Sequence, residues 1–166
     1  MNIFVVDKDP SKSAIMLSDK HVIKMILESS QLLCTAHHIC GAPPTDRYFL
    51  KKTHINHPCN KWSRQSINNY RWLANHNYYL CKEYTHRYNK IHKVERERLM
   101  EWLLNNIPDL PNIGLTNFAL AMPDEFKTKD VVKSYRLYYN NSKAHLFSWK
   151  NREKPFWIGG KDEVSR

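Results

Sequence analysis

Apolar side chains recur at intervals of three or four residues along the stretch from residue 18 to residue 39. They are Val22, Ile23, Ile26, Leu27, Leu33 and Ala36. This is the period of one face of an α-helix, with Ser18 in the N-cap position and Gly41 where the helix should end. No segment of the sequence shows the sustained alternation that marks a half-buried strand. The pattern therefore predicts an all-α fold.

Three further helices are expected along the chain. The first spans about 58–89, opening near Pro58 and with a break near 75–77 as one option. The others span about 93–106 and 129–148, and the stretches 41–57 and 107–127 are predicted to be long ordered loops. Residues 2–6 form a short apolar stretch that ends in a turn at Asp7–Pro10. We expect one compact domain over residues 1–166, a bundle of about four main helices.

The charge balance favours a polyanionic partner. Lys and Arg outnumber Asp and Glu by 26 to 16, which gives a formal charge of +10. Nucleic acid is the first expectation, and an acidic membrane surface or an indifferent basic surface are the alternatives. No apolar run reaches the roughly 20 residues of a membrane span, so we expect no membrane partner. The first residues lack a signal peptide's features, which predicts a cytoplasmic protein whose four cysteines are free thiols.

Four polar residues near the start of the first long helix are candidates for acid–base chemistry. His21 and Glu28 are seven residues apart, close to two helical turns, so they share one face with Lys24 between them and Asp19 just before. An imidazole, an ammonium and a carboxylate in one row suit chemistry beside a phosphate backbone. The alternative is an ordinary solvated helix face, because a Glu becomes an acid or base only when its surroundings move its pKa.

Basic and aromatic residues are interleaved in two stretches, one around Lys61 to Trp72 and one from Lys133 to Trp157. Cations bind phosphates, and exposed aromatic rings stack on bases. We predict phosphate contacts from Lys61, Arg64, Arg71 and Arg136, and stacking by Trp62 and Tyr139. Aromatic residues at helical spacing are also typical of a core, and that alternative applies to Trp62, Tyr135 and Tyr138.

Histidines and cysteines gather in two places, at 34–40 and at 54–59. Zinc sites use such residues at short spacings. No paired Cys-x-x-Cys is present, so we predict no metal site and no cofactor. Instead we expect His57 to be an N-cap or a polar contact near a site, and Cys34 to be a small core residue.

Three segments resemble one family. Asp19-x-His21 with Glu28, then His57-Pro58-x-x-Lys61-Trp62, then the run from Tyr135 to Tyr139 followed by Lys143-Ala144, are similar to segments of the phage endonuclease-V-type pyrimidine-dimer DNA glycosylases and their bacterial relatives. The order is that of the family, which is all-helical and basic. Sequences resembling nearly the whole chain are associated with phage and large-virus genomes, so a viral protein in the host cytoplasm is expected.

The resemblance implies a mechanism. In that family the N-terminal α-amine attacks the sugar C1′ of the lesion nucleotide, the base leaves, an imine forms, and β-elimination nicks the strand. Carried over, the amine belongs to Met1, the proton-transferring carboxylate is Glu28, and His21 assists it. An α-amine with a pKa of about 7.7–8.0 is partly neutral and nucleophilic near pH 7. Because Asn2 is large, we expect Met1 to be retained.

The chain departs from the family pattern near its glutamate. The family's arginines fall on Leu27 and Gln31, and Lys20 and Lys24 replace them only in part because ammonium lacks the guanidinium fork. Five extra residues precede Asp19. These differences leave a modified pyrimidine open as the target in place of a dimer.

We therefore predict a DNA glycosylase with associated lyase activity on damaged or modified pyrimidines in double-stranded DNA, its oligomeric state left open. Two alternatives stand beside it. One is a non-catalytic viral protein that binds nucleic acid or blocks a host defence factor, and the other is a metal-dependent nuclease or nucleotide-modifying enzyme that uses the His/Cys residues.

Overall fold

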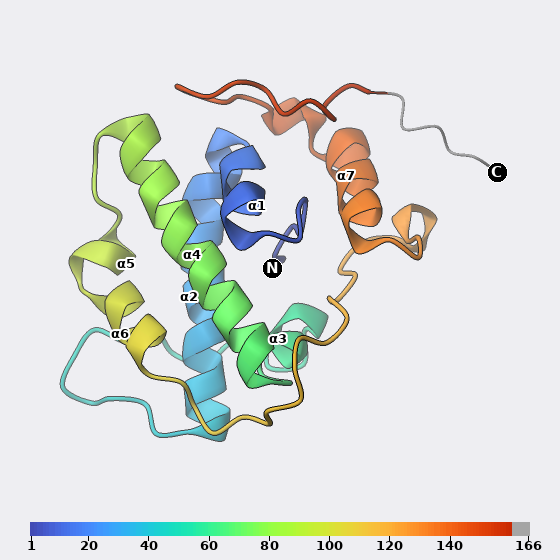
Figure 1. Ribbon diagram of the computed structural model, residues 1–166. Helices are drawn as coiled ribbons and strands as arrows, with labels where there is room; N and C mark the ends of the chain where they lie inside the picture. Colours follow the sequence, from blue (N-terminus) through green and yellow to red (C-terminus); the bar gives the residue numbers. More distant parts are fainter. Residues whose placement is uncertain (161–166) are drawn as a thin grey trace.

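The computed structural model describes residues 1–160, and every regular element within them is helical (Figure 1). The elements in chain order are α1 (Pro10–Met16), α2 (Asp19–Cys40), α3 (Pro58–Ser63), α4 (Ile67–Tyr88), α5 (Lys93–Arg96), α6 (Leu99–Asn105), η1 (Asp124–Phe126), α7 (Val131–Ser142) and η2 (Ala144–Leu146). The all-α prediction is confirmed. No helix within residues 1–160 has the length and apolar character needed to cross a membrane.

Two helices of 22 residues each, α2 and α4, form the centre of the fold. They run in opposite directions (Figure 1), and their facing apolar residues are fully buried, among them Val22, Ile26 and Leu33 on α2 and Leu73 and Leu80 on α4. Helix α1 packs against α4, and α6 packs against both long helices. Of the predicted apolar positions of α2, Val22, Ile26, Leu33 and Ala36 face the core. Ile23 and Leu27 are exposed, so the prediction is wrong for these two positions.

The N-terminal segment is an inner part of the molecule. Residues Ile3 to Val6 are all buried, and the chain terminus lies between α7 and the group formed by α1, α2 and α4 (Figure 1). The long loop 107–127 leads from α6 to α7 and contributes partly buried apolar residues to the core. This arrangement brings the first residues, α2 and α7 together.

Two of the predicted helices are divided. The stretch 58–89 breaks at Arg64–Ser66, where the hydroxyl of Ser66 accepts the N–H of Asn69 at 3.1 Å and caps a new helix. The stretch 93–106 breaks at Arg98, which takes the left-handed conformation with φ 58°. The optional break at 75–77 is absent, because α4 continues through these residues without interruption.

One helix was not predicted, and another is shorter than predicted. Helix α1 was missed, although Asp9 accepts the N–H groups of Ser11 and Lys12 and Pro10 occupies the first turn. Helix α7 starts at its cap Asp130 and stops at Ser142, shorter than the predicted 129–148, and η2 follows it. The N-cap prediction for His57 is confirmed, because its Nδ1 accepts the N–H of Cys59 at 3.1 Å.

A fully buried guanidinium ties the start of α2 to the end of α4. Arg87 donates to Asp19 at 3.0 Å and to Glu83 at 3.0 Å, and it also donates to the carbonyls of Ile15 and Leu17 at 2.9 Å each. Glu83 in turn accepts from Arg152 of the C-terminal stretch at 2.6 Å. Asp19, a member of the predicted acid–base row, is thus occupied in holding the fold.

Three buried histidines make stability depend on pH. Burial lowers the pKa of each of His21, His37 and His76 to about 4, from 6.5. Between these values the unfolded chain binds more protons than the folded one, so stability is full above pH 6.5 and falls as the pH drops toward 4. We expect the unfolding free energy to fall between pH 7 and 4.5 by roughly 1–3 kcal/mol for each of the three histidines, about 3–9 kcal/mol together. Urea titrations at both pH values measure it, and equal midpoints would contradict it.

Candidate active site

The N-terminal amine and the carboxylate of Glu28 lie next to each other. The nitrogen of Met1 is 3.9 Å from Oε2 of Glu28, and the backbone N–H of Asn2 donates to the same oxygen at 3.3 Å. The other carboxylate oxygen faces Lys24 Nζ at 3.5 Å, one helical turn away on α2. Glu28 is half-buried and meets three nitrogens, so it sits in a positively charged environment.

These groups line a hollow of about 170 Å³. Its walls include Met1, Asn2, Phe4, His21, Lys24, Glu28, Tyr138 and Lys143. The volume is below the roughly 300–1,000 Å³ of pockets that enclose a small molecule, so a ligand here must lie mostly outside it. Two lysines and the amine against one carboxylate leave surplus positive charge, which suits a phosphodiester backbone.

His21 is a buried, neutral member of this wall. Its Nδ1 is 2.6 Å from the hydroxyl of Tyr139, whose oxygen already accepts the N–H of Ser18 at 2.9 Å. Tyr139, Ser18 and His21 therefore form one hydrogen-bond network, in which the hydroxyl of Tyr139 donates to Oγ of Ser18 at 3.2 Å. Burial, with Lys143 and Lys24 nearby, lowers the pKa of His21 to about 4. The imidazole is thus neutral at pH 7, and its Nδ1 is held by the hydroxyl of Tyr139.

The hydroxyl of Ser18, the predicted N-cap residue, is bound to Tyr139 and His21 instead of capping the helix. Ser18 stands at the N-cap position of α2, but its side chain makes no capping bond. Its hydroxyl accepts from Tyr139 at 3.2 Å and lies 3.3 Å from Nδ1 of His21. The position was predicted correctly, and the hydroxyl belongs to the network that orients His21.

Aromatic rings form one side of the hollow. The ring of Tyr138 lies nearly parallel to that of Phe4, with centroids 6.2 Å apart and 15° between the planes, and Phe4 also packs on His21 at 4.6 Å. Lys143 Nζ lies 5.1 Å from the centroid of Tyr138. Sequence reasoning missed Asn2, Tyr138 and Lys143 as residues of the site. The Tyr-rich run of the last helix was the available signal, but it does not tell which ring faces outward.

The two predicted stacking residues lie in the core instead. Trp62 is 2 % exposed, packed against Phe118 and Trp72, and Tyr139 is fully buried against His21 and Phe147. Neither ring has a free face for a base. The stacking prediction is wrong for both because their helices turn these positions inward, and Tyr138, one residue earlier on α7, faces the hollow.

Two of the predicted phosphate contacts are occupied within the protein. Arg64 donates to Asn60 at 2.6 Å and to the carbonyl of Ile55 at 2.7 Å. Arg136 donates to the carbonyl of Val6 at 3.0 Å, with Asp7 at 3.9 Å, so its guanidinium holds the N-terminal segment against α7. Both arginines are partly exposed and have partners within the protein, and their contact with phosphate stays a prediction.

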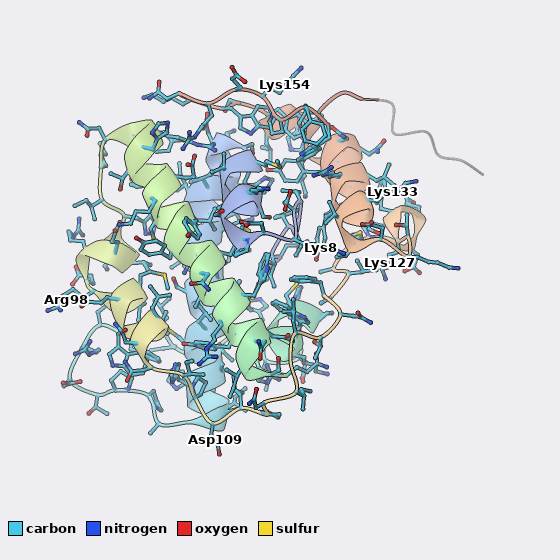
Figure 2. The ribbon with its side chains drawn as sticks, in the orientation of Figure 1. Lys8, Arg98, Asp109, Lys127, Lys133 and Lys154 are labelled. Atoms are coloured by element: carbon cyan, nitrogen blue, oxygen red, sulfur yellow. The ribbon has the colours of Figure 1, made fainter. Side chains whose placement is uncertain are left out.

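The remaining predicted contacts are exposed lysines and an arginine, namely Lys20, Lys24, Lys61 and Arg71. Figure 2 shows further lysines, Lys8, Lys127 and Lys133, on the α7 side of the molecule. Lys127 pairs with Asp124 at 2.7 Å, whereas Lys8 and Lys133 are exposed. Contact of any of these with DNA stays a prediction.

The histidines and cysteines do not come together as a ligand set. Within residues 1–160 no three His, Cys, Asp or Glu side chains are placed to share a metal ion. Cys34 is a buried core residue, as expected, and burial raises the pKa of its thiol to about 12.

The first part of the chain matches a known family. A scan against protein families matches residues 1–96 to the family described as pyrimidine dimer DNA glycosylase. The matched stretch is more than half of the 166 residues and contains Met1, His21 and Glu28, while α7 lies beyond it. Searches of curated proteins and of solved structures give no match. With its amine beside a helical glutamate and a match over most of its length, the chain belongs to the pyrimidine dimer DNA glycosylase family, whose substrate is DNA.

Proposed function

We propose that the protein removes damaged or modified pyrimidines from double-stranded DNA and then cuts the strand, with the Met1 amine as nucleophile. One observation carries the proposal: the only α-amine of the chain lies 3.9 Å from a carboxylate in a basic hollow. An amine that attacks a sugar carbon needs a partner to accept and return protons, and Glu28 is within reach of that task.

The first step exchanges one bond at C1′ for another. The lone pair of the Met1 nitrogen attacks C1′, the bond from C1′ to the base breaks, and the base leaves with that electron pair and a proton. The proton of the base comes from solvent. The nitrogen passes one of its own protons through Glu28 to O4′ as the C1′–O4′ bond breaks, so the sugar ring opens and a protonated imine remains. Glu28 accepts the proton of the amine, because its Oε2 is the carboxylate oxygen nearest to that nitrogen.

The second step is β-elimination. The imine makes the C2′ proton acidic, Glu28 removes it, and the electron pair expels the 3′-phosphate as the C3′–O bond breaks. Lys24 and Lys143 stabilise the negative charge of the phosphate that leaves. The neutral His21 lines the hollow beside the sugar and is held in orientation by Tyr139.

Access to C1′ requires the lesion to leave the base stack. Extrusion costs a few kcal/mol and is easiest at damaged positions. In this proposal Tyr138, which is partly exposed and lines the hollow, takes the place of the predicted Trp62 and Tyr139 as the aromatic residue that contacts an extruded base.

Borohydride trapping tests the proposal. The chain beginning at Met1 is mixed with duplexes that carry a pyrimidine dimer, a modified pyrimidine or an abasic site, and the imine is reduced to a covalent link. We expect a cross-linked species from the unaltered chain. Adding a few residues before Met1 should lower its yield by roughly 100-fold or more, because a peptide nitrogen is not nucleophilic.

The matched control adds the same residues after Arg166, which should leave trapping unchanged. If no duplex gives a cross-link, or if the N-terminally extended chain traps as well as the unaltered one, the proposal fails.

A further inference from the structure

The side chain of Asn2 anchors the first residues to a distant loop. It is 7 % exposed, and its Nδ2 donates to the carbonyl of Ala121 at 2.7 Å, across 119 positions of sequence. Its Oδ1 accepts the N–H groups of Ile3 at 2.7 Å and Phe4 at 3.2 Å. All three hydrogen bonds of this side chain are made to backbone groups, so the side chain fixes the backbone around it.

The backbone next to Asn2 follows a constrained path. Phe4 takes a positive φ of 54°, a conformation uncommon for a bulky residue. The Asx-type turn closed by Asn2 supports that conformation, and Phe4 is then held between His21 and Tyr138. The segment is thus fixed on both sides of residue 3, by hydrogen bonds and by packing.

This arrangement leaves the amine little freedom. The N–H of Asn2 already meets Oε2 of Glu28 at 3.3 Å, and the Met1 nitrogen is only one residue further. Few backbone torsions separate the fixed peptide of Asn2 from that nitrogen. A reacting group that is already fixed in the correct orientation reacts faster, because the entropic cost of orienting it is not part of the activation barrier.

We propose that Asn2 is a positioning residue for the nucleophile: its amide, anchored on Ala121, sets the Met1 amine against Glu28. This rests on the proposed function, since it concerns the same amine. It predicts that loss of the anchor slows covalent capture and leaves DNA affinity intact, because Asn2 acts through the amine. A displacement near 1 Å costs up to about 100-fold in rate.

The test compares Asn2→Leu with the unaltered chain. Leucine has nearly the same size without the amide, and as a large second residue it keeps Met1 in place, which an intact mass confirms. Single-turnover borohydride capture on an abasic duplex and the Kd for that duplex, measured by fluorescence anisotropy, are the two readouts. We expect capture roughly 10–100-fold slower with Kd unchanged within about twofold.

Asn140→Leu is the matched control. The Nδ2 of Asn140 donates to the carbonyl of Trp157 at 3.0 Å. The substitution therefore removes a comparable side-chain-to-backbone hydrogen bond that does not involve the first residues. Capture by this variant should match that of the unaltered chain. Equal slowing in both variants would show a general loss of packing and overturn the inference.

If Asn2→Leu does not fold, the same two measurements are made on Asn2→Gln. It keeps an amide, but the longer stem displaces the anchor, so capture should again be slowed with Kd retained. Capture at the unaltered rate by either Asn2 variant overturns the inference while leaving the proposed function standing. Absence of capture by the unaltered chain overturns the proposed function itself, so the two failures are distinct.

Discussion

Replacement of Glu28 by Gln is expected to lower the single-turnover rate of strand cleavage by about 10²–10⁴-fold, the usual contribution of a general acid–base group. Gln keeps the size of the side chain but cannot take a proton from the amine or from C2′. DNA binding should be retained or tightened, because the change removes a negative charge that faces Lys24 and the Met1 amine. A quenched-flow assay on a lesion duplex measures the rate.

Glu101→Gln is the control for this prediction. Glu101 is exposed and pairs with Arg98 on the surface at 2.8 Å, so its loss should leave cleavage unchanged. The Glu28 variant also separates the enzyme from a protein that only binds nucleic acid. Cleavage by Glu28→Gln at the rate of the unaltered chain would mean that this carboxylate plays no part in the chemistry.

The largest loss of stability is expected from Arg87→Met. The guanidinium is fully buried between α1, α2 and α4, and the change leaves Asp19 and Glu83 short of a partner and two carbonyls without a donor. Breaking a buried ion pair from one side costs about 3–5 kcal/mol. We expect the unfolding free energy to fall by that amount, measured by urea titration at pH 7.

Arg98→Met provides the comparison on the surface. Its pair with Glu101 is exposed on both sides, and such pairs contribute about 0–1 kcal/mol. If Arg87→Met lost no more stability than Arg98→Met, the buried network would not hold the start of α2. The position of His21 and Glu28 on that helix would then need another explanation.

The fold was largely predictable because helical periodicity is a local property. The apolar spacing of residues 18–39 gave α2 nearly to its ends, and Pro58 marked the start of α3. The divisions at Ser66 and Arg98 were not predictable in the same way. They depend on a capping hydroxyl and a left-handed residue within otherwise helical patterns.

The site was predictable only where its residues share one helix. His21, Lys24 and Glu28 face the same hollow because they are spaced along α2. The partners that reach them from elsewhere were not foreseen. Tyr138 and Lys143 come from the last part of the chain, and spacing alone does not tell whether Tyr138 or Tyr139 faces inward. The role of Asn2 depends on the carbonyl of Ala121, which no local pattern reveals.

In the proposed reaction the α-amine, rather than a lysine, forms the bond to DNA. Lys24 and Lys143 line the same hollow and are the rival amines. The direct measurement is to trap the complex with borohydride, digest both partners and locate the sugar remnant by mass spectrometry. We expect the remnant on the nitrogen of Met1. A remnant on Lys24 or Lys143 would contradict it.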